Sequence, residues 1–194
     1  MVHSFYAMPP LSPQADDPDA PHLEAFCAGD HTAFDLLART HRAGLKQLVT
    51  RYVRAEADAE DVTQLALVRA FEKRELFRGE SKFRTWLYRI AVNVALNHIR
   101  KPLHIGDTNV DDIAAFTHSL ETSKLVAAEV WGKMAKRIET LPPKQRLVTE
   151  LRLFHELSFE EVAVIADCTE EAAKMNFHHA VKTLRGVLPP TTEE

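Results

Sequence analysis

The placement of proline divides this chain into segments and limits the folds available to each. Ten prolines are present among the 194 residues, yet none lies between residues 30 and 101, where the only glycines are Gly44 and Gly79. Proline lacks the N–H that a helix requires and pushes the preceding residue out of the helical region. The proline-free stretch is therefore open to long helices. We expect helices to end at the prolines that follow, which are Pro102, Pro142, Pro143, Pro189 and Pro190.

Helical periodicity fills most of this proline-free stretch. Apolar residues recur at spacings of three and four in three series, over residues 34–52, 62–70 and 83–97. This spacing is typical of amphipathic helices that bury one face. We expect three such helices, separated by an acidic turn at residues 56–61 and a break at Arg78–Gly79. Together they form one helical domain over residues 22–101.

The remaining segments complete a second domain and its connections. Residues 1–21 contain five prolines and three aspartates, which favour a flexible N-terminal tail. Residues 102–124 are acidic with little periodicity, and we interpret them as a linker. Helical patterning resumes over residues 125–188, and residues 189–194 form a short tail. Because no stretch alternates as a strand would, the predicted fold class is all-α, with two helical domains joined by the acidic linker.

Composition excludes several classes of protein. The chain is 45% apolar, which is enough for two small cores and unlike a disordered chain. No apolar run approaches the ~18 residues that span a bilayer, and the N-terminus lacks the features of a signal peptide. We therefore expect a cytoplasmic protein without membrane insertion. Cys27 and Cys168 belong to no metal-spaced cluster, so two free thiols, no metal and no cofactor are expected.

The second domain contains the pattern of a helix-turn-helix. Ser158, followed three residues later by Glu161, is a capping box that starts a short helix ending at Ala166. Thr169 can cap a longer helix after a three-residue turn. This layout can place the second helix in the major groove of DNA. A solvated helical hairpin explains the same pattern equally well.

Positive charge is concentrated at the end of the first domain. From residue 78 to residue 101, six lysines and arginines and a single acid, Glu80, give a net charge of +5. The aromatic residues Phe77, Phe83, Trp86 and Tyr88 lie among them. A basic surface with aromatic residues suits single-stranded or melting DNA, since cations neutralise phosphates and rings stack on unpaired bases. The alternative places Phe83 and Trp86 in the core, and helical spacing favours the core for Trp86.

Four sequence segments carry a resemblance to a known family. Residues 77–93 (FRGESKFRTWLYRIAVN) and 58–64 (DAEDVTQ) resemble the second conserved region of extracytoplasmic-function (group IV) sigma factors of the sigma-70 family. Residues 141–146 (LPPKQR) and 157–163 (LSFEEVA) are similar to the fourth region of that family. The segments follow the family's order. The resemblance implies an alternative sigma factor that directs core RNA polymerase to promoters.

The resemblance also implies where the polymerase binds. In this family the helix that holds Asp61 and Gln64 docks on the clamp helices of the polymerase β′ subunit. Coulomb attraction is modest at an exposed surface, so an apolar patch with polar groups that set its register is expected. The residues expected in this contact are Asp58, Asp61, Gln64, Leu65, Val68 and Arg69.

For the first domain, the resemblance further implies that it opens promoter DNA. The loop at residues 77–82 resembles the loop that captures a flipped base of the minus-ten element, and Asn93 stands where an asparagine contacts the melted junction. The expected minus-ten surface comprises Phe77, Arg78, Lys82, Phe83, Arg84, Trp86, Arg89, Asn93, Asn97, Arg100 and Lys101. The linker resembles the family's third-region connector through the polymerase cleft, although an ordinary solvated linker explains its acids nearly as well.

The second domain departs from the family in its reading helix. Lys174 and His178 fit the family pattern, but Asn176 and His179 stand where arginine is common. The carboxylates at the start of the helix also repel phosphate. The expected minus-thirty-five contacts are Thr169, Lys174, Asn176, His178, His179 and Lys182. The family's contact with the polymerase β flap tip could compensate for this weaker surface.

Other functions compete with this interpretation. A sigma-like decoy would bind a regulator without initiating transcription, and a weak reading helix favours it. The basic, aromatic segment at residues 77–101 argues against a decoy, because a decoy need not melt DNA. A simple helix-turn-helix repressor leaves the first domain unexplained, and no constellation of residues supports an enzyme. A separate anti-sigma factor is an expected partner.

Overall fold

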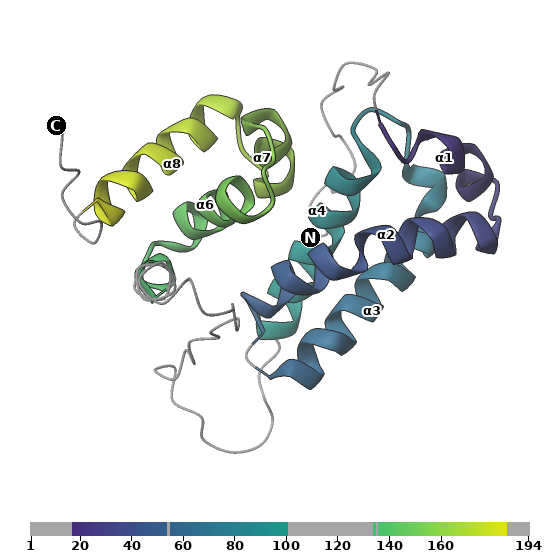
Figure 1. Cartoon of the computed structure of the whole chain (residues 1–194), viewed down its shortest axis with the longest axis horizontal. Helices are drawn as coiled ribbons and strands as arrows, with labels where there is room; N and C mark the ends of the chain where they lie inside the picture. Colours follow the sequence, from purple (N-terminus) through teal and green to yellow (C-terminus); the bar gives the residue numbers. More distant parts are fainter. Residues whose placement is uncertain (1–16, 54, 101–133, 135, 186–194) are drawn as a thin grey trace, which may run out of the picture. The chain divides into compact units, whose positions relative to one another are not determined.

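The structure is a computed structural model of the chain and describes residues 17–53, 55–100, 134 and 136–185. Every regular element in these residues is a helix, which confirms the predicted all-α class. The chain divides into two compact units, residues 1–106 and 107–194 (Figure 1). Several predictions fall outside the described residues: Lys101, the tail up to residue 16, the linker at 102–124, the helical pattern over 125–133 and the tail at 189–194.

The first unit is a helical bundle. It contains α1 (Ala20–Cys27), α2 (His31–Thr50), α3 (Glu56–Glu72), the short 3-10 helix η1 (Arg74–Leu76) and α4 (Phe83–Arg100). α2 and α3 lie side by side (Figure 1), and because Arg42 pairs with Glu60 while Lys46 pairs with Glu56, they run antiparallel. α4 packs against both helices. The largest fully buried side chains of this unit include Phe26, Leu37, Leu45, Leu48, Phe83 and Leu87.

Two sequence-based boundaries in this unit were wrong. The acidic residues 56–61 form the first turns of α3 rather than a separate turn. Carboxylates at Glu56 and Asp58 favour a helix start, because they face the positive end of the helix dipole. The expected tail also ends before residue 21. Asp17 and Asp19 are buried, and Pro21 lies in the first turn of α1, where proline is tolerated.

The second unit holds the helix-turn-helix. It contains α6 (Pro143–Phe154), α7 (Phe159–Ala166) and α8 (Glu170–Leu184), preceded by a helical stretch at residues 136–139. α8 packs against both α6 and α7. One apolar cluster consists of Ile138, Leu141, Ala180 and Leu184 with Met134 and Phe154 packed on it. α6 ends at Phe154, and Glu156 just after it adopts a left-handed backbone conformation with φ 54°.

Candidate functional site

Four aromatic side chains from three segments form one buried cluster in the first unit. Phe26 of α1, Phe77 after η1, and Phe83 and Trp86 of α4 lie with ring centroids 5.3–6.5 Å apart. Aromatic pairs in edge-to-face arrangements add ~0.5–1.5 kcal/mol beyond the burial of their area. The cluster therefore joins the N-terminal helix to both ends of the loop at residues 77–82.

This cluster corrects part of the predicted minus-ten surface. Phe77, Phe83 and Trp86 are 9%, 0% and 7% exposed, so their rings are not available to stack on a base. The alternative interpretation, in which these side chains belong to the core, therefore holds for Phe77, Phe83 and Trp86. Helical spacing predicted that Trp86 is buried. The burial of Phe77 depends on its contact with Phe26 of α1, a helix that the periodicity of the sequence did not predict.

The loop between Phe77 and Phe83 is fixed at its ends and exposed at its tip. Arg78 and Gly79 are exposed, while Ser81 is buried. Gly79 has φ +69°, and a Cβ there would meet no other atom within 4 Å. The glycine is therefore required by the backbone conformation rather than by space. The tip offers a cation and an open stretch of backbone on a rigid aromatic base.

Two aspartates hold this base in place from the N-terminal side. Asp17 Oδ2 accepts a hydrogen bond from the backbone nitrogen of Phe83 at 3.3 Å, at the start of α4. Asp19 Oδ2 lies 2.7 Å from Nε2 of His41, whose ring packs 5.7 Å from that of Phe83. Sequence reasoning missed both aspartates because their partners lie 66 and 22 residues away.

Of the polar residues of α4 that were predicted to contact the minus-ten element, four share one side of the helix and Arg84 lies on another. Arg89, Asn93, Asn97 and Arg100 are spaced by four, four and three residues, which places them along one stripe of the helix. Within the stripe, Asn93 is half-buried and its Nδ2 donates to the carbonyl oxygen of Arg89 at 2.6 Å. Arg84 points elsewhere, since its five-residue offset from Arg89 corresponds to about 140° around the helix. The α4 stripe is thus a polar line along the second half of α4.

α3 presents the six residues predicted to bind polymerase on one exposed face. Its opposite face is buried in the bundle through Ala59, Val62, Ala66 and Ala70. Leu65 and Val68 are 44% and 52% exposed and lie three residues apart, so they are neighbours on this face. Two further members of the face are paired, Asp58 with His98 at 3.9 Å and Arg69 with Glu72 at 3.0 Å. The exposed residues of this α3 face are Asp58, Asp61, Gln64, Leu65, Val68 and Arg69.

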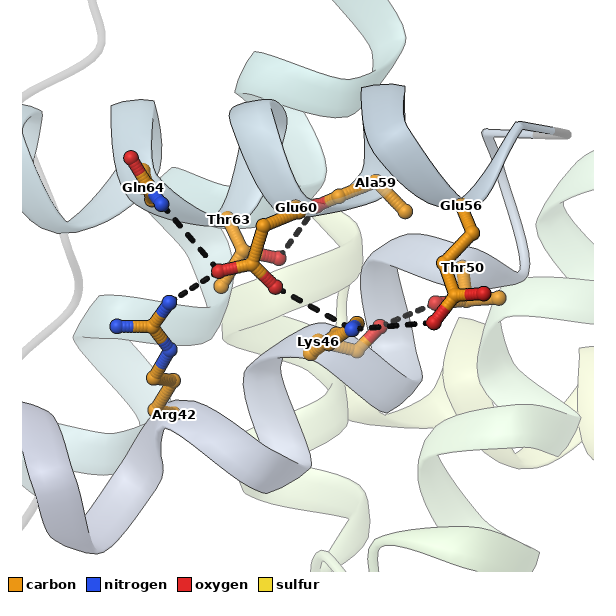
Figure 2. Close-up of polar contacts among 8 residues, drawn as sticks. All are labelled: Arg42, Lys46, Thr50, Glu56, Ala59, Glu60, Thr63 and Gln64. Atoms are coloured by element: carbon orange, nitrogen blue, oxygen red, sulfur yellow. Dashed lines mark hydrogen bonds and ion pairs between the residues drawn. The ribbon is translucent and has the colours of Figure 1, made fainter.

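A network that the sequence analysis missed fixes the α3 face relative to α2. Figure 2 shows Glu60 between Arg42 and Lys46 of α2 and Gln64 of α3. Hydrogen bonds from Gln64, Arg42 and Lys46 lower the pKa of the Glu60 carboxyl, while the bond to Glu60 raises the pKa of Lys46. Opposite charges at facing positions of two amphipathic helices could have indicated this pairing.

The helix-turn-helix has the caps that the sequence predicts. The hydroxyl of Ser158 accepts from the backbone nitrogen of Glu161 at 3.1 Å, and the Glu161 carboxylate accepts from the nitrogen of Ser158 at 2.8 Å. Thr169 caps α8 by accepting from Ala172 N at 3.2 Å. The turn uses Asp167 in a left-handed conformation, φ 52°. Phe177 of α8 packs on Phe159 of α7, ring centroids 5.6 Å apart.

The predicted minus-thirty-five residues differ in their availability on α8. Lys174 is held by Glu170 at 2.7 Å, which raises the pKa of its ammonium group. Asn176 is half-buried and donates to the carbonyl of Ala172 at 2.8 Å. His178, His179 and Lys182 are exposed on the helix. A DNA ligand must therefore compete for Lys174 and Asn176 but meets the other three directly.

Other kinds of site lack support in the described residues. They contain no group of three or more histidine, cysteine, aspartate or glutamate side chains that could hold a metal ion. No helix within the described ranges is long and apolar enough to cross a membrane. Cys27 and Cys168 are free, and burial raises the pKa of both thiols.

The sequences of known proteins match both units. The sequence model of sigma-70 region 2 matches residues 37–102, and that of sigma-70 region 4 matches residues 132–184. The RNA polymerase sigma-H factor of Pseudomonas aeruginosa is 31% identical over 183 residues, covering 89% of this chain and 94% of the relative. The ECF RNA polymerase sigma-E factor of Escherichia coli is 34% identical over 178 residues, covering 87% and 93%.

Solved structures agree on the fold. The structure titled CnrH in complex with the cytosolic domain of CnrY has a TM-score of 0.66 at 21% identity, covering 87% of this chain and 96% of that one. The sigma factor RpoE in complex with the anti-sigma factor NepR from Bartonella quintana has a TM-score of 0.62 at 21% identity, covering 81% and 98%.

A helix-turn-helix unit that follows a separate helical unit with the α4 stripe is typical of DNA-binding transcription proteins. Both halves of the chain match the two conserved regions in family order, and its relatives align over nearly their whole length. The chain belongs to the sigma-70 family of RNA polymerase sigma factors, in its extracytoplasmic-function group.

Proposed function

We propose that this sigma factor directs core RNA polymerase to specific promoters and opens the minus-ten element with the loop at residues 77–82 and the α4 stripe. The exposed tip of Arg78 and Gly79 on a buried aromatic base carries the proposal. A flipped base needs a preformed surface, because unstacking already costs a few kcal/mol. A rigid loop avoids a further cost of ordering.

The α4 stripe supplies the groups that strand opening needs. Arg89 and Arg100 neutralise phosphates, which positions the DNA without reading its sequence. Asn93 and Asn97 offer amide donors and acceptors to unpaired base edges. To do so, Asn93 exchanges its hydrogen bond with the Arg89 carbonyl for one with a base. The proposed minus-ten surface is thus Arg78, Lys82, Arg89, Asn93, Asn97 and Arg100, with Arg84 and Lys101 as flanking phosphate contacts.

The α3 face is the proposed docking surface for the clamp helices of the polymerase β′ subunit. Leu65 and Val68 form its apolar centre, and Asp61, Gln64 and Arg69 surround them. An apolar centre with a polar rim is the usual anatomy of a protein interface.

In the second unit, α8 is proposed to contact the minus-thirty-five element. The remaining surface of this unit is proposed to contact the polymerase flap tip.

A separate anti-sigma factor is also proposed as a partner. Two proteins with the same fold were solved as complexes. The RpoE of Bartonella quintana was solved with the anti-sigma factor NepR, and CnrH was solved with the cytosolic domain of CnrY. The α3 face is a surface that an inhibitor could cover, because its apolar centre is exposed in the free chain.

The proposal is tested by measuring strand opening in reconstituted holoenzyme. Unpaired thymines of the minus-ten element react with permanganate, and core binding is measured separately by fluorescence anisotropy. Asn93→Ala and Arg78→Ala should reduce opening about tenfold, the equivalent of one lost base contact, with core binding unchanged. Arg39→Ala, an exposed arginine on α2, is the matched control. Normal opening by both variants would overturn the proposed minus-ten surface.

A further inference from the structure

Met175 is an apolar side chain in an unexpected place. At 56% exposure it is the most exposed large hydrophobic residue in the part of the chain that the structure describes. It lies in the second turn of α8, between Lys174 and Asn176. Neither the packing of the second unit nor the contacts proposed above use it.

The geometry of α8 turns Met175 directly away from its own unit. The buried residues of the helix are Ala173, Ala180 and Leu184. Met175 follows Ala173 by two residues, which is about 200° around an α-helix. Glu171, His178 and Lys182 lie at offsets of minus four, plus three and plus seven from Met175, so they share its line. This line of four exposed residues is the surface of α8 farthest from the core.

The neighbours of Met175 at the N-terminal end of α8 favour base edges over phosphates. Glu171 repels phosphate one turn before Met175. Glu170 holds Lys174 on one side at 2.7 Å, and the Ala172 carbonyl holds Asn176 on the other at 2.8 Å. In a helix-turn-helix, the N-terminal part of the second helix contacts base edges in the major groove. An apolar side chain there has one apolar partner, the C5 methyl group of thymine.

We propose that Met175 is a specificity residue that selects thymine at one position of the minus-thirty-five element through contact with the thymine methyl group. This inference rests on the proposed function. It assigns sequence selection to a thioether at the N-terminal end of α8, where Lys174 and Asn176 are already paired.

The test removes only the methyl group. Duplexes are first enriched by the holoenzyme from a promoter library with a randomised minus-thirty-five element. Each thymine of that element is then replaced in turn by deoxyuridine, and holoenzyme affinity is measured. At one position the substitution should weaken binding by wild type about fourfold, the value of one buried carbon group. The Met175→Ala variant should lose that sensitivity, whereas Met175→Leu should keep it.

Thr183→Ala, an exposed change on the same helix off the Met175 line, should keep the sensitivity to deoxyuridine. No sensitive thymine in wild type, or a sensitive thymine that remains so in Met175→Ala, would overturn the inference. Promoter-specific transcription by the same holoenzyme separates the two claims. If transcription occurs, only the inference has failed, and if none occurs the proposed function has failed as well.

Discussion

Asp17 accepts a hydrogen bond from the backbone nitrogen of Phe83, and the two residues are 66 positions apart in the chain. The first backbone nitrogens of a helix have no partner within the helix, so a carboxylate at this point caps α4 from outside. The same residue of α4 belongs to the aromatic cluster beneath the 77–82 loop. The segment before α1 therefore supports the surface proposed to open DNA.

Loss of this cap should weaken both the fold and strand opening. We expect Asp17→Ala to lower the free energy of unfolding by ~1 kcal/mol, the usual effect of removing a capping carboxylate. Urea denaturation of the purified chain measures this change. Asp35→Ala, which alters an exposed carboxylate on α2, should have almost no effect. Equal stability of the two variants would show that the bond to Phe83 does not support α4.

Gly44 should be required by Tyr88 rather than by the backbone of α2. A Cβ at Gly44 would clash with the hydroxyl oxygen of Tyr88, a buried side chain of α4. Gly44→Ala gains ~1 kcal/mol of helix propensity, but overpacking costs ~1–3 kcal/mol and should prevail. We therefore expect net destabilisation in urea.

The matching double variant identifies the cause. Tyr88→Phe removes the clashing oxygen and leaves the nearest ring carbon at 3.5 Å, an ordinary contact. In the Tyr88→Phe background, Gly44→Ala should be neutral or stabilising. A stabilising effect of Gly44→Ala in the wild-type background would contradict this explanation.

The α2–α3 network should give the fold a measurable dependence on acid pH. Hydrogen bonds from Gln64, Arg42 and Lys46 hold the pKa of the Glu60 carboxyl below its ordinary value. A carboxyl with a lowered folded-state pKa stabilises the fold above its unfolded pKa, and the effect disappears as the pH falls through the folded value. The melting temperature of wild type should exceed that of Glu60→Gln slightly at neutral pH, because exposed pairs contribute little. A difference between the two melting temperatures that did not narrow as the pH was lowered would contradict this assignment.

Docking on polymerase should depend on the apolar centre of the α3 face. Leu65→Asp places a charge in the proposed interface and should weaken core binding at least tenfold, about 1.4 kcal/mol. Because Leu65 is 44% exposed, the melting temperature should change little. Leu36→Asp is a matched control, since Leu36 is equally exposed on α2. Equal losses for both variants would show that the contact is not specific to the α3 face.

Local signals explain what could be predicted from the sequence. The caps at Ser158 and Thr169 act within three residues, so the helix-turn-helix boundaries were predicted closely. The start of α3 was missed because acidic residues suit both a turn and the first turn of a helix. Long-range pairs such as Asp19 with His41 leave no periodic trace in the sequence.

For the candidate sites too, some features could be predicted from the sequence and others depend on long-range packing. The exposure of Leu65 and Val68 agrees with the face that the family resemblance indicated. Phe77 and Phe83 were placed on a DNA surface because basic and aromatic residues alternate there, and only the packing of α1 shows them to be buried. Met175 was overlooked because one apolar residue on a helix has no pattern of its own until the buried face is known.

Run-off transcription by core polymerase reconstituted with this chain tests the central claim most directly. We predict promoter-specific product that requires this sigma factor and falls about tenfold with Asn93→Ala, as expected for one lost base contact. Absence of product from any promoter of the library, together with tight binding of an anti-sigma partner, would contradict the claim and identify the chain as a sigma-like decoy.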